Sequence, residues 1–190
     1  MNQVLPTLMT VDEFLRWSVR QEQGRYELEG GRVIAMPAET AGHVLLKHVV
    51  HDALVAAIKR AAVPYFSWQN GMAVRVGEGR TFEPDILVAP LPYPAKASLV
   101  IENPVIVVEV LSPSTMRRDL TTKVAGYALV ASIEHYVVID PEERAVLHFR
   151  RKGDALAPPE QPVAADGVLR LEPPGLEVPV IELLGPEPAA

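Results

Sequence analysis

The chain has 190 residues, of which 48% are apolar and 22% are charged, and its formal net charge is −6 at pH 7. A chain of this size and composition can bury a core, so it is not a disordered chain and fits one α/β domain, or one domain with a short appendage. The negative balance argues against a strongly basic protein that coats DNA. There is no cysteine, which excludes disulfides and thiolate zinc sites and favours hard cations such as Mg²⁺ or Mn²⁺ for any metal site.

The charge is spread unevenly along the chain. Residues 151–190 carry three basic and seven acidic residues, whereas residues 1–150 carry 15 basic and 17 acidic ones. We therefore expect a main domain over residues 1–152 and a Pro-rich acidic extension over residues 153–190 that packs on the same domain. No stretch approaches 18 consecutive apolar residues, and the N-terminus lacks the features of a signal peptide. These observations predict a cytoplasmic protein with no membrane association.

The first third of the chain predicts a helix, a hairpin and a longer helix. Thr10 and Glu13 have the spacing of a capping box, so a helix should begin there and run to about residue 22. The Gly-Gly pair at residues 30 and 31 separates two strand-like runs, which indicates a β-hairpin. Apolar residues at helical spacing over residues 41–62 predict a long amphipathic helix.

The rest of the chain predicts most of a sheet. Strand-like runs cover about 65–69, 72–76, 84–89, 105–110, 135–139 and 145–150, and a helix is expected over 115–131. The strand–helix–strand order from residue 105 to residue 139 predicts a crossover between parallel strands. The expected fold is α/β, with a mixed sheet flanked by helices and preceded by an N-terminal helix and a β-hairpin. Trp17 and Trp68 are expected in the core, and Ser114 is expected to cap the helix 115–131.

Two carboxylates stand out in the strand-like runs. Glu109 interrupts an otherwise apolar run, and an ionised carboxylate is costly to bury unless it is paired or bound to a metal. Asp85 begins a run that should form a neighbouring strand. Two converging carboxylates repel each other unless a cation lies between them, so the pair is typical of a Mg²⁺ site that a substrate phosphate completes. Two alternatives stay open: Glu109 could reach solvent or an arginine, and Asp85 could cap a loop.

Three basic residues of the helix 115–131 are further candidates. Lys123 lies at the edge of the apolar face, where it could orient an attacking water or offset developing charge. The alternative for Lys123 is a surface pair with Asp119 at i, i+4 spacing. Arg117 and Arg118 lie near the helix N-terminus, where backbone donors favour anions, and together could hold a substrate phosphate. A solvated pair of arginines is the alternative.

These residues carry a resemblance to a known superfamily. The chain is similar to PD-(D/E)xK, or restriction-endonuclease-like, nucleases in Pro84-Asp85, in the stretch from Glu109 to Thr115, and in Arg118-Asp119 with Lys123. From about Met9 to Asp140 it resembles, more narrowly, a large bacterial family of restriction-type endonucleases long described as a domain of unknown function. The resemblance implies a restriction-endonuclease-like core. It also implies Mg²⁺-dependent hydrolysis of DNA phosphodiester bonds, with Mn²⁺ as a substitute and with Asp85, Glu109 and the Val110 carbonyl as metal ligands.

The resemblance also implies roles outside the carboxylate pair. Glu27 would be an accessory acid, for which a cross-strand pair in the hairpin is the alternative. His43 is either an accessory site residue or a packing histidine. The chain departs from the superfamily at Leu111, where the general pattern has lysine. The narrower family places its lysine on the following helix, at Lys123 here, which makes Asp85, Glu109, Lys123 and Glu27 the expected catalytic residues.

The sequence leaves three functions open. The first is a nuclease with DNA as substrate, for which a homodimer is one arrangement that the sequence neither requires nor excludes. The second is a nuclease-fold binding or assembly module with a degraded site, which Leu111 and the acidic balance favour. The third is a hydrolase that acts on RNA or nucleotides.

Overall fold

A computed structural model of the protein describes residues 8–185. Its helices are α1 (Val11–Ser18), α2 (Ala41–Ala61), α3 (Met116–Arg118), the π-helical segment η1 (Asp119–Lys123), α4 (Val124–Ala128) and α5 (Val180–Leu184). Its strands are β1 (Tyr26–Glu29), β2 (Arg32–Ala35), β3 (Tyr65–Gln69), β4 (Val74–Arg75), β5 (Thr81–Phe82), β6 (Ile86–Pro90), β7 (Ile106–Val110), β8 (His135–Asp140), β9 (Ala145–Lys152), β10 (Ala155–Ala157), β11 (Val163–Ala164), β12 (Val168–Leu171) and β13 (Leu176–Pro179).

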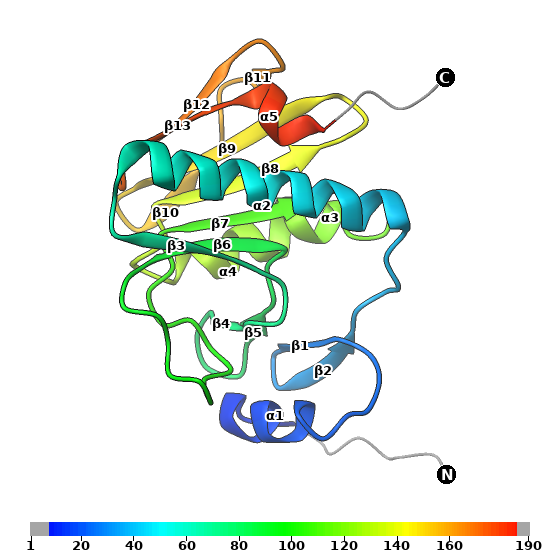
Figure 1. Ribbon diagram of the computed structural model, residues 1–190. Coiled ribbons are helices and arrows are strands. Elements are labelled where there is room, and N and C mark those ends of the chain that lie inside the picture. Colours follow the sequence, from blue (N-terminus) through cyan, green and yellow to red (C-terminus); the bar gives the residue numbers. More distant parts are fainter. Residues whose placement is uncertain (1–7, 186–190) are drawn as a thin grey trace.

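A seven-stranded mixed sheet forms the centre of the molecule (Figure 1). Its strands lie in the order β10-β9-β8-β7-β6-β3, and β11 pairs with β9. The pair β7–β8 is parallel and the pairs on either side of it are antiparallel, which confirms the parallel crossover and the mixed sheet predicted from the sequence. A four-stranded sheet, β2-β1-β5-β4, and the hairpin β12-β13 complete the fold.

Helices cover both faces of the central sheet. Alternate residues of a strand point to opposite faces, and in β7 this places Ile106 and Val108 in one core cluster with Leu54 of α2. Val107 instead belongs to a second cluster with Tyr127 of α4. All five residues of β7 are therefore buried, as the apolar run in the sequence indicated.

The long helix α2 lies along one face of this sheet. Its N-cap is Thr40, whose hydroxyl accepts a hydrogen bond from the backbone N–H of His43 at 3.3 Å. By length and composition, α2 is the one helix among the described residues that could cross a membrane. However, Leu46, Val50 and Leu54 pack into the core cluster that contains β7, which is how the core helix of a folded domain packs.

The C-terminal segment also packs against α2. Leu169 and Leu171 of β12 and Leu176 and Val178 of β13 belong to the same core cluster as α2 and β7. The hairpin and α5 therefore cover part of the sheet's α2 side, as Figure 1 shows near the top of the view. The expected division at residue 152 stays a prediction.

Several local predictions were wrong. The first helix ends at Ser18 rather than near residue 22. Trp68 has 37% of its surface exposed, because it lies on β3, which is an edge strand of the sheet. The segment between β3 and β6 forms two short strands, β4 and β5, where the sequence predicted one, because two-residue strands leave almost no alternation to detect.

The predicted helix 115–131 is shorter and less regular than expected. It consists of α3, η1 and α4, and it ends at Ala128. The N-cap position is taken by Thr115, not by Ser114, whose hydroxyl lies 3.1 Å from the hydroxyl of Ser112. The π-helical turn changes the phase of the helix, and such turns are frequent at functional sites.

Candidate active site

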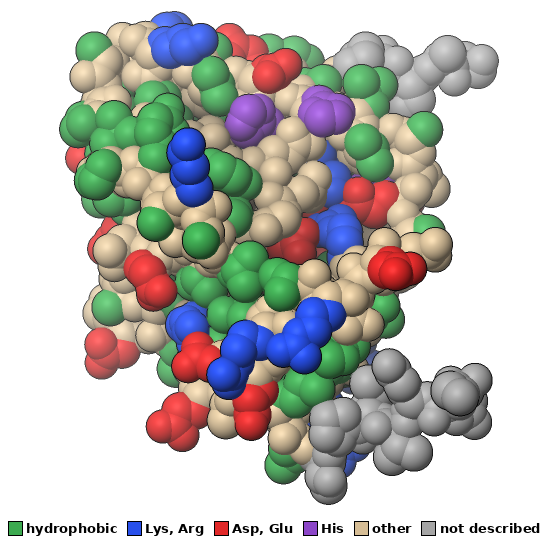
Figure 2. Space-filling model, turned by 60° about the horizontal axis from the view of Figure 1, so that its bottom comes forward, with side chains coloured by type: hydrophobic (Ala, Val, Ile, Leu, Met, Phe, Trp, Pro, Cys, Tyr) green, Lys and Arg blue, Asp and Glu red, His purple; other side chains and the backbone are tan. Residues whose placement is uncertain are grey.

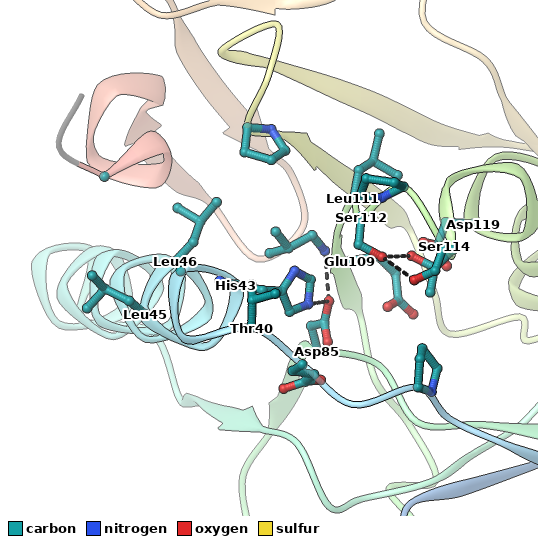
Figure 3. Close-up of a pocket in the computed structure, with 18 of the residues that line it drawn as sticks. Thr40, His43, Leu45, Leu46, Asp85, Glu109, Leu111, Ser112, Ser114 and Asp119 are labelled. Atoms are coloured by element: carbon teal, nitrogen blue, oxygen red, sulfur yellow. Dashed lines mark hydrogen bonds and ion pairs between the residues drawn. The ribbon is translucent and has the colours of Figure 1, made fainter. Parts of the chain in front are cut away.

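The two predicted metal ligands lie on neighbouring antiparallel strands. β6 and β7 pair Ile86 with Val108, so Asp85, one residue before β6, continues this register opposite Glu109. Opposed residues of an antiparallel pair present their side chains on the same face of the sheet. Both carboxylates line one cavity of about 630 Å³, and Figure 3 shows them side by side there.

The Asp85 carboxylate is held on both of its oxygens. Its Oδ2 accepts a hydrogen bond from the backbone N–H of Val110 at 2.8 Å and lies 3.8 Å from Nε2 of His43. Its Oδ1 lies 3.4 Å from Nζ of Lys47. With only 7% of the residue exposed, Asp85 is a buried carboxylate with a defined orientation.

Glu109 is buried and receives both of its hydrogen bonds on one oxygen. Lys123 Nζ donates to Oε1 at 2.7 Å and the Tyr127 hydroxyl donates to the same atom at 2.9 Å. No hydrogen bond from residues 8–185 ends on Oε2. Burial raises the pKa of the Glu109 carboxyl well above its usual value. Lys123 opposes this shift, whereas the negative charges of Asp85 and the other acidic neighbours of Glu109 raise the pKa further.

Lys123 stands among three carboxylates. Its Nζ lies 2.7 Å from Glu109, 3.3 Å from Asp119 and 3.7 Å from Glu27. Burial alone would lower the pKa of Lys123, but these negative charges outweigh burial and raise it. The pair with Asp119 that the spacing suggested is present, but it is buried rather than on the surface, because η1 turns both side chains inward.

Glu27 lies behind Lys123 and is fully buried. It forms an ion pair with Arg118 and accepts a hydrogen bond from the backbone N–H of Glu83 at 2.9 Å. In the hairpin Glu27 stands opposite Ile34, so it has no charged cross-strand partner there. Its charged contacts instead point toward the helix that carries Lys123.

The two arginines expected to hold a phosphate do not line the cavity. Arg118 pairs with Glu27, lies 3.3 Å from Glu29, and stacks over the ring of Phe82 with its guanidinium carbon 5.4 Å from the ring centroid. A buried carboxylate needs a counter-charge, so Glu27 accounts for the inward position of Arg118. Arg117 is exposed.

His43 and Glu39 line the cavity, and the sequence did not point to Glu39 or to its neighbour Lys47. Glu39, His43 and Asp85 offer ligand atoms within 4.8 Å of one another, so this set could hold a metal ion. Lys47, which is fully buried, donates to Glu39 at 2.6 and 2.7 Å. A signal for Lys47 was present, because it lies one turn before Val50 on the apolar face of the predicted helix.

Fold and site together define an α/β protein of the restriction-endonuclease-like class, with buried carboxylates where two central strands meet. Residues 11–180 match the model of the Uma2 family, described as "Putative restriction endonuclease", and the chain belongs to this family. The family implies a hydrolase of the nuclease type with a nucleic-acid substrate.

Two individual proteins are similar to this chain. The uncharacterized protein sll1609 of Synechocystis sp. is 26% identical over 152 residues, which cover 77% of this chain and 83% of that protein. A crystal structure of a "putative nuclease belonging to DUF820" from Anabaena variabilis matches with a TM-score of 0.69 at 18% identity, over 93% of this chain and 97% of that one. The structural likeness supports the fold.

Proposed function

We propose that the protein is a metal-dependent endonuclease that hydrolyses phosphodiester bonds of DNA. The observation that carries this proposal is the opposition of Asp85 and Glu109 across β6 and β7, inside a cavity and with Lys123 hydrogen-bonded to Glu109. The donor set fits Mg²⁺, with Mn²⁺ as a substitute, because this cation is held by one or two carboxylates together with water and substrate phosphate.

Asp85, Glu109 and the carbonyl of Val110 are the proposed metal ligands, and the position of His43 and Glu39 beside Asp85 adds two more donors to that side of the cavity. A bound divalent cation would stabilise phosphate charge and lower the pKa of a bound water. Lys123 and Tyr127 both donate to Oε1 of Glu109, and no other donor among the described residues bonds to Oε2. This second oxygen could therefore bind a cation, which supports the assignment.

Lys123 would act as a cation and not as a general base. Its raised pKa keeps the ammonium group charged at neutral pH, so it cannot accept a proton from water there. In this role it orients Glu109 and offsets the negative charge that develops on the phosphate. Glu27 would support it at a distance of 3.7 Å, while pairing with Arg118 on its other side.

DNA would be bound through local contacts and not through a broad basic surface. In Figure 2, basic side chains lie interspersed with acidic ones on the face shown. Among the described residues, Lys123 and Arg144 are the Lys and Arg side chains that line the cavity. We expect the protein to act in the cytoplasm, and a homodimer through β9 or the C-terminal segment stays an open expectation.

Cleavage assays on plasmid DNA, single-stranded DNA and RNA, with Mg²⁺, Mn²⁺ or a chelator, test this proposal. We expect metal-dependent DNA cleavage that falls at least about 100-fold in Asp85→Asn and Glu109→Gln, since even partners of metal ligands contribute up to this much. Asp52→Asn is the control, because Asp52 lies on α2 with 85% of its side chain exposed. Cleavage that survives Asp85→Asn unchanged would refute the assignment.

The second candidate function, a binding or assembly module with a degraded site, has one observation in its favour. Lysine ammonium groups already stand beside both carboxylates, Lys47 beside Asp85 and Lys123 beside Glu109. A folded protein that cleaves none of the three substrates with either metal would support this reading. Cleavage restricted to RNA would instead support the RNA hydrolase.

A further inference from the structure

A second buried lysine lies beside the site, and the proposed function does not use it. Lys47 of α2 has 0% of its surface exposed. Its Nζ donates to both carboxylate oxygens of Glu39, at 2.7 and 2.6 Å, and to Oδ1 of Asn70 at 2.9 Å. The same ammonium lies 3.4 Å from Oδ1 of Asp85.

A buried ammonium group is costly unless several acceptors surround it, and those of Lys47 come from three separate segments. Glu39 precedes α2, Asn70 follows β3, and Asp85 precedes β6. Asn70 has a left-handed backbone with φ of 52° and donates its N–H to the Asp85 carbonyl at 3.0 Å. Lys47 therefore connects the segments that surround the Asp85 carboxylate.

Lys47 also shares its acceptors with the set that could hold a metal. Glu39 and Asp85 are two of the three residues in that set, and both carry oxygens near Nζ of Lys47. The other oxygen of Asp85 is held by the Val110 N–H, on the opposite side of the carboxylate. A divalent cation on Asp85 would thus have an ammonium group as its close neighbour.

We propose that Lys47 is a positioning residue of this site, which orients the Asp85 carboxylate and competes with the divalent cation for it. The inference rests on the proposed function for the identity of Asp85 as a metal ligand. Two positive charges that share a carboxylate repel each other strongly in a partly buried site. Removal of the Lys47 charge should therefore tighten metal binding, while the less ordered carboxylate makes cleavage slower.

Calorimetric titration of the full chain with Mn²⁺ at pH 7 tests the inference. Lys47→Met keeps a long apolar stem without the charge, and we expect it to bind Mn²⁺ on the order of tenfold more tightly than the natural chain. Lys59→Met is the matched control, because Lys59 is exposed on the same helix, and it should bind as the natural chain does. A lysine that only stabilised the fold would not tighten metal binding when removed.

The titration has four outcomes, and each either supports or overturns the inference. Tighter binding by Lys47→Met, or binding by this variant alone, supports the inference. Binding that is equal or weaker in Lys47→Met overturns it and leaves the proposed function standing. Binding by neither chain overturns both the metal site and the inference. If Lys47→Met does not fold, Lys47→Gln takes its place, and failure of both to fold makes Lys47 a structural residue and overturns the inference.

Discussion

At the scale of single residues, the site consists of charged groups that lie inside the protein. Lys123 faces Glu109, Asp119 and Glu27, and Lys47 faces Glu39 and Asp85. Five carboxylates thus meet two ammonium groups in and behind one cavity. Arg118 adds a counter-charge to Glu27 and Arg25 adds one to Glu39. Glu109 differs, because burial raises the pKa of its carboxyl, so its ionised form is destabilising until a further cation binds.

Glu109→Gln should therefore stabilise the metal-free protein at neutral pH. The pKa of Glu109 is raised above its ordinary value of 4.5 by burial, so its contribution to stability is full below pH 4.5 and is lost as pH rises through the folded-state pKa. Glutamine keeps an acceptor for Lys123 and Tyr127 without the charge. We expect about 1 kcal/mol of added stability at pH 7, which is in the range typical of stabilising changes.

Urea unfolding of both proteins at pH 4 and pH 7 measures this effect. The difference should be large at pH 7 and small at pH 4, where the natural side chain is protonated. Glu102→Gln is the control, because Glu102 is exposed, and it should show no such pH-dependent gain. A loss of stability in Glu109→Gln at pH 7 would mean that the carboxylate is a structural partner of Lys123.

The sequence predicted some of these residues and missed others for physical reasons. Asp85 and Glu109 could be found because a charge within an apolar strand is conspicuous. Lys47 was missed because a long side chain on an apolar helix face usually reaches solvent along its stem. Arg118 was placed with the phosphate because the sequence does not reveal that Glu27, from a distant hairpin, needs its charge.

At the scale of elements, the close packing of α4 against β5 positions the helical segment that carries Lys123 and Tyr127. Gly126 of α4 faces the ring of Phe82, and that ring lies edge-on to Tyr127 with centroids 5.4 Å apart. Tyr127 in turn donates to Glu109. This chain of contacts was not predictable from the sequence, because neither β5 nor the π-helical turn leaves a pattern in it.

Gly126→Ala should destabilise the protein although alanine favours helices. A Cβ at this position would collide with the Phe82 ring, which is fully buried and cannot move aside easily. Overpacking of this kind costs about 1–3 kcal/mol. Gly42→Ala in α2 is the control, because a Cβ there meets nothing within 4 Å, and it should stabilise the protein by up to about 1 kcal/mol. Thermal unfolding of both variants measures whether each change raises or lowers the stability. If Gly126→Ala were as stable as the natural chain, the Phe82 ring would be able to move aside, and the prediction would be wrong.

At the scale of the whole molecule, the C-terminal segment and the central sheet share one core. β12 alternates between exposed and buried residues, with Val168 and Arg170 outward and Leu169 and Leu171 inward. The inward residues contact the cluster that contains α2 and β7. Nearby, Nε2 of His135 in β8 lies 2.9 Å from the carbonyl of Pro173 in the loop of the hairpin. The sequence predicted an extension that packs on the main domain, but it did not reveal which of its residues would be buried.

Leu169→Asp should therefore destabilise the main body and not only the hairpin. An unpaired charge in a buried position costs at least about 3 kcal/mol, a large part of the stability of a typical domain. Trp17 and Trp68 both lie outside the C-terminal segment, so their fluorescence reports unfolding of the main body. We expect Leu169→Asp to shift the tryptophan-monitored transition to lower urea. Val168→Asp changes the neighbouring exposed residue in the same way and should leave that transition in place. If the tryptophan transition of Leu169→Asp were unchanged, the segment after residue 152 would be an independent unit, because its core could then be lost without loss of the sheet.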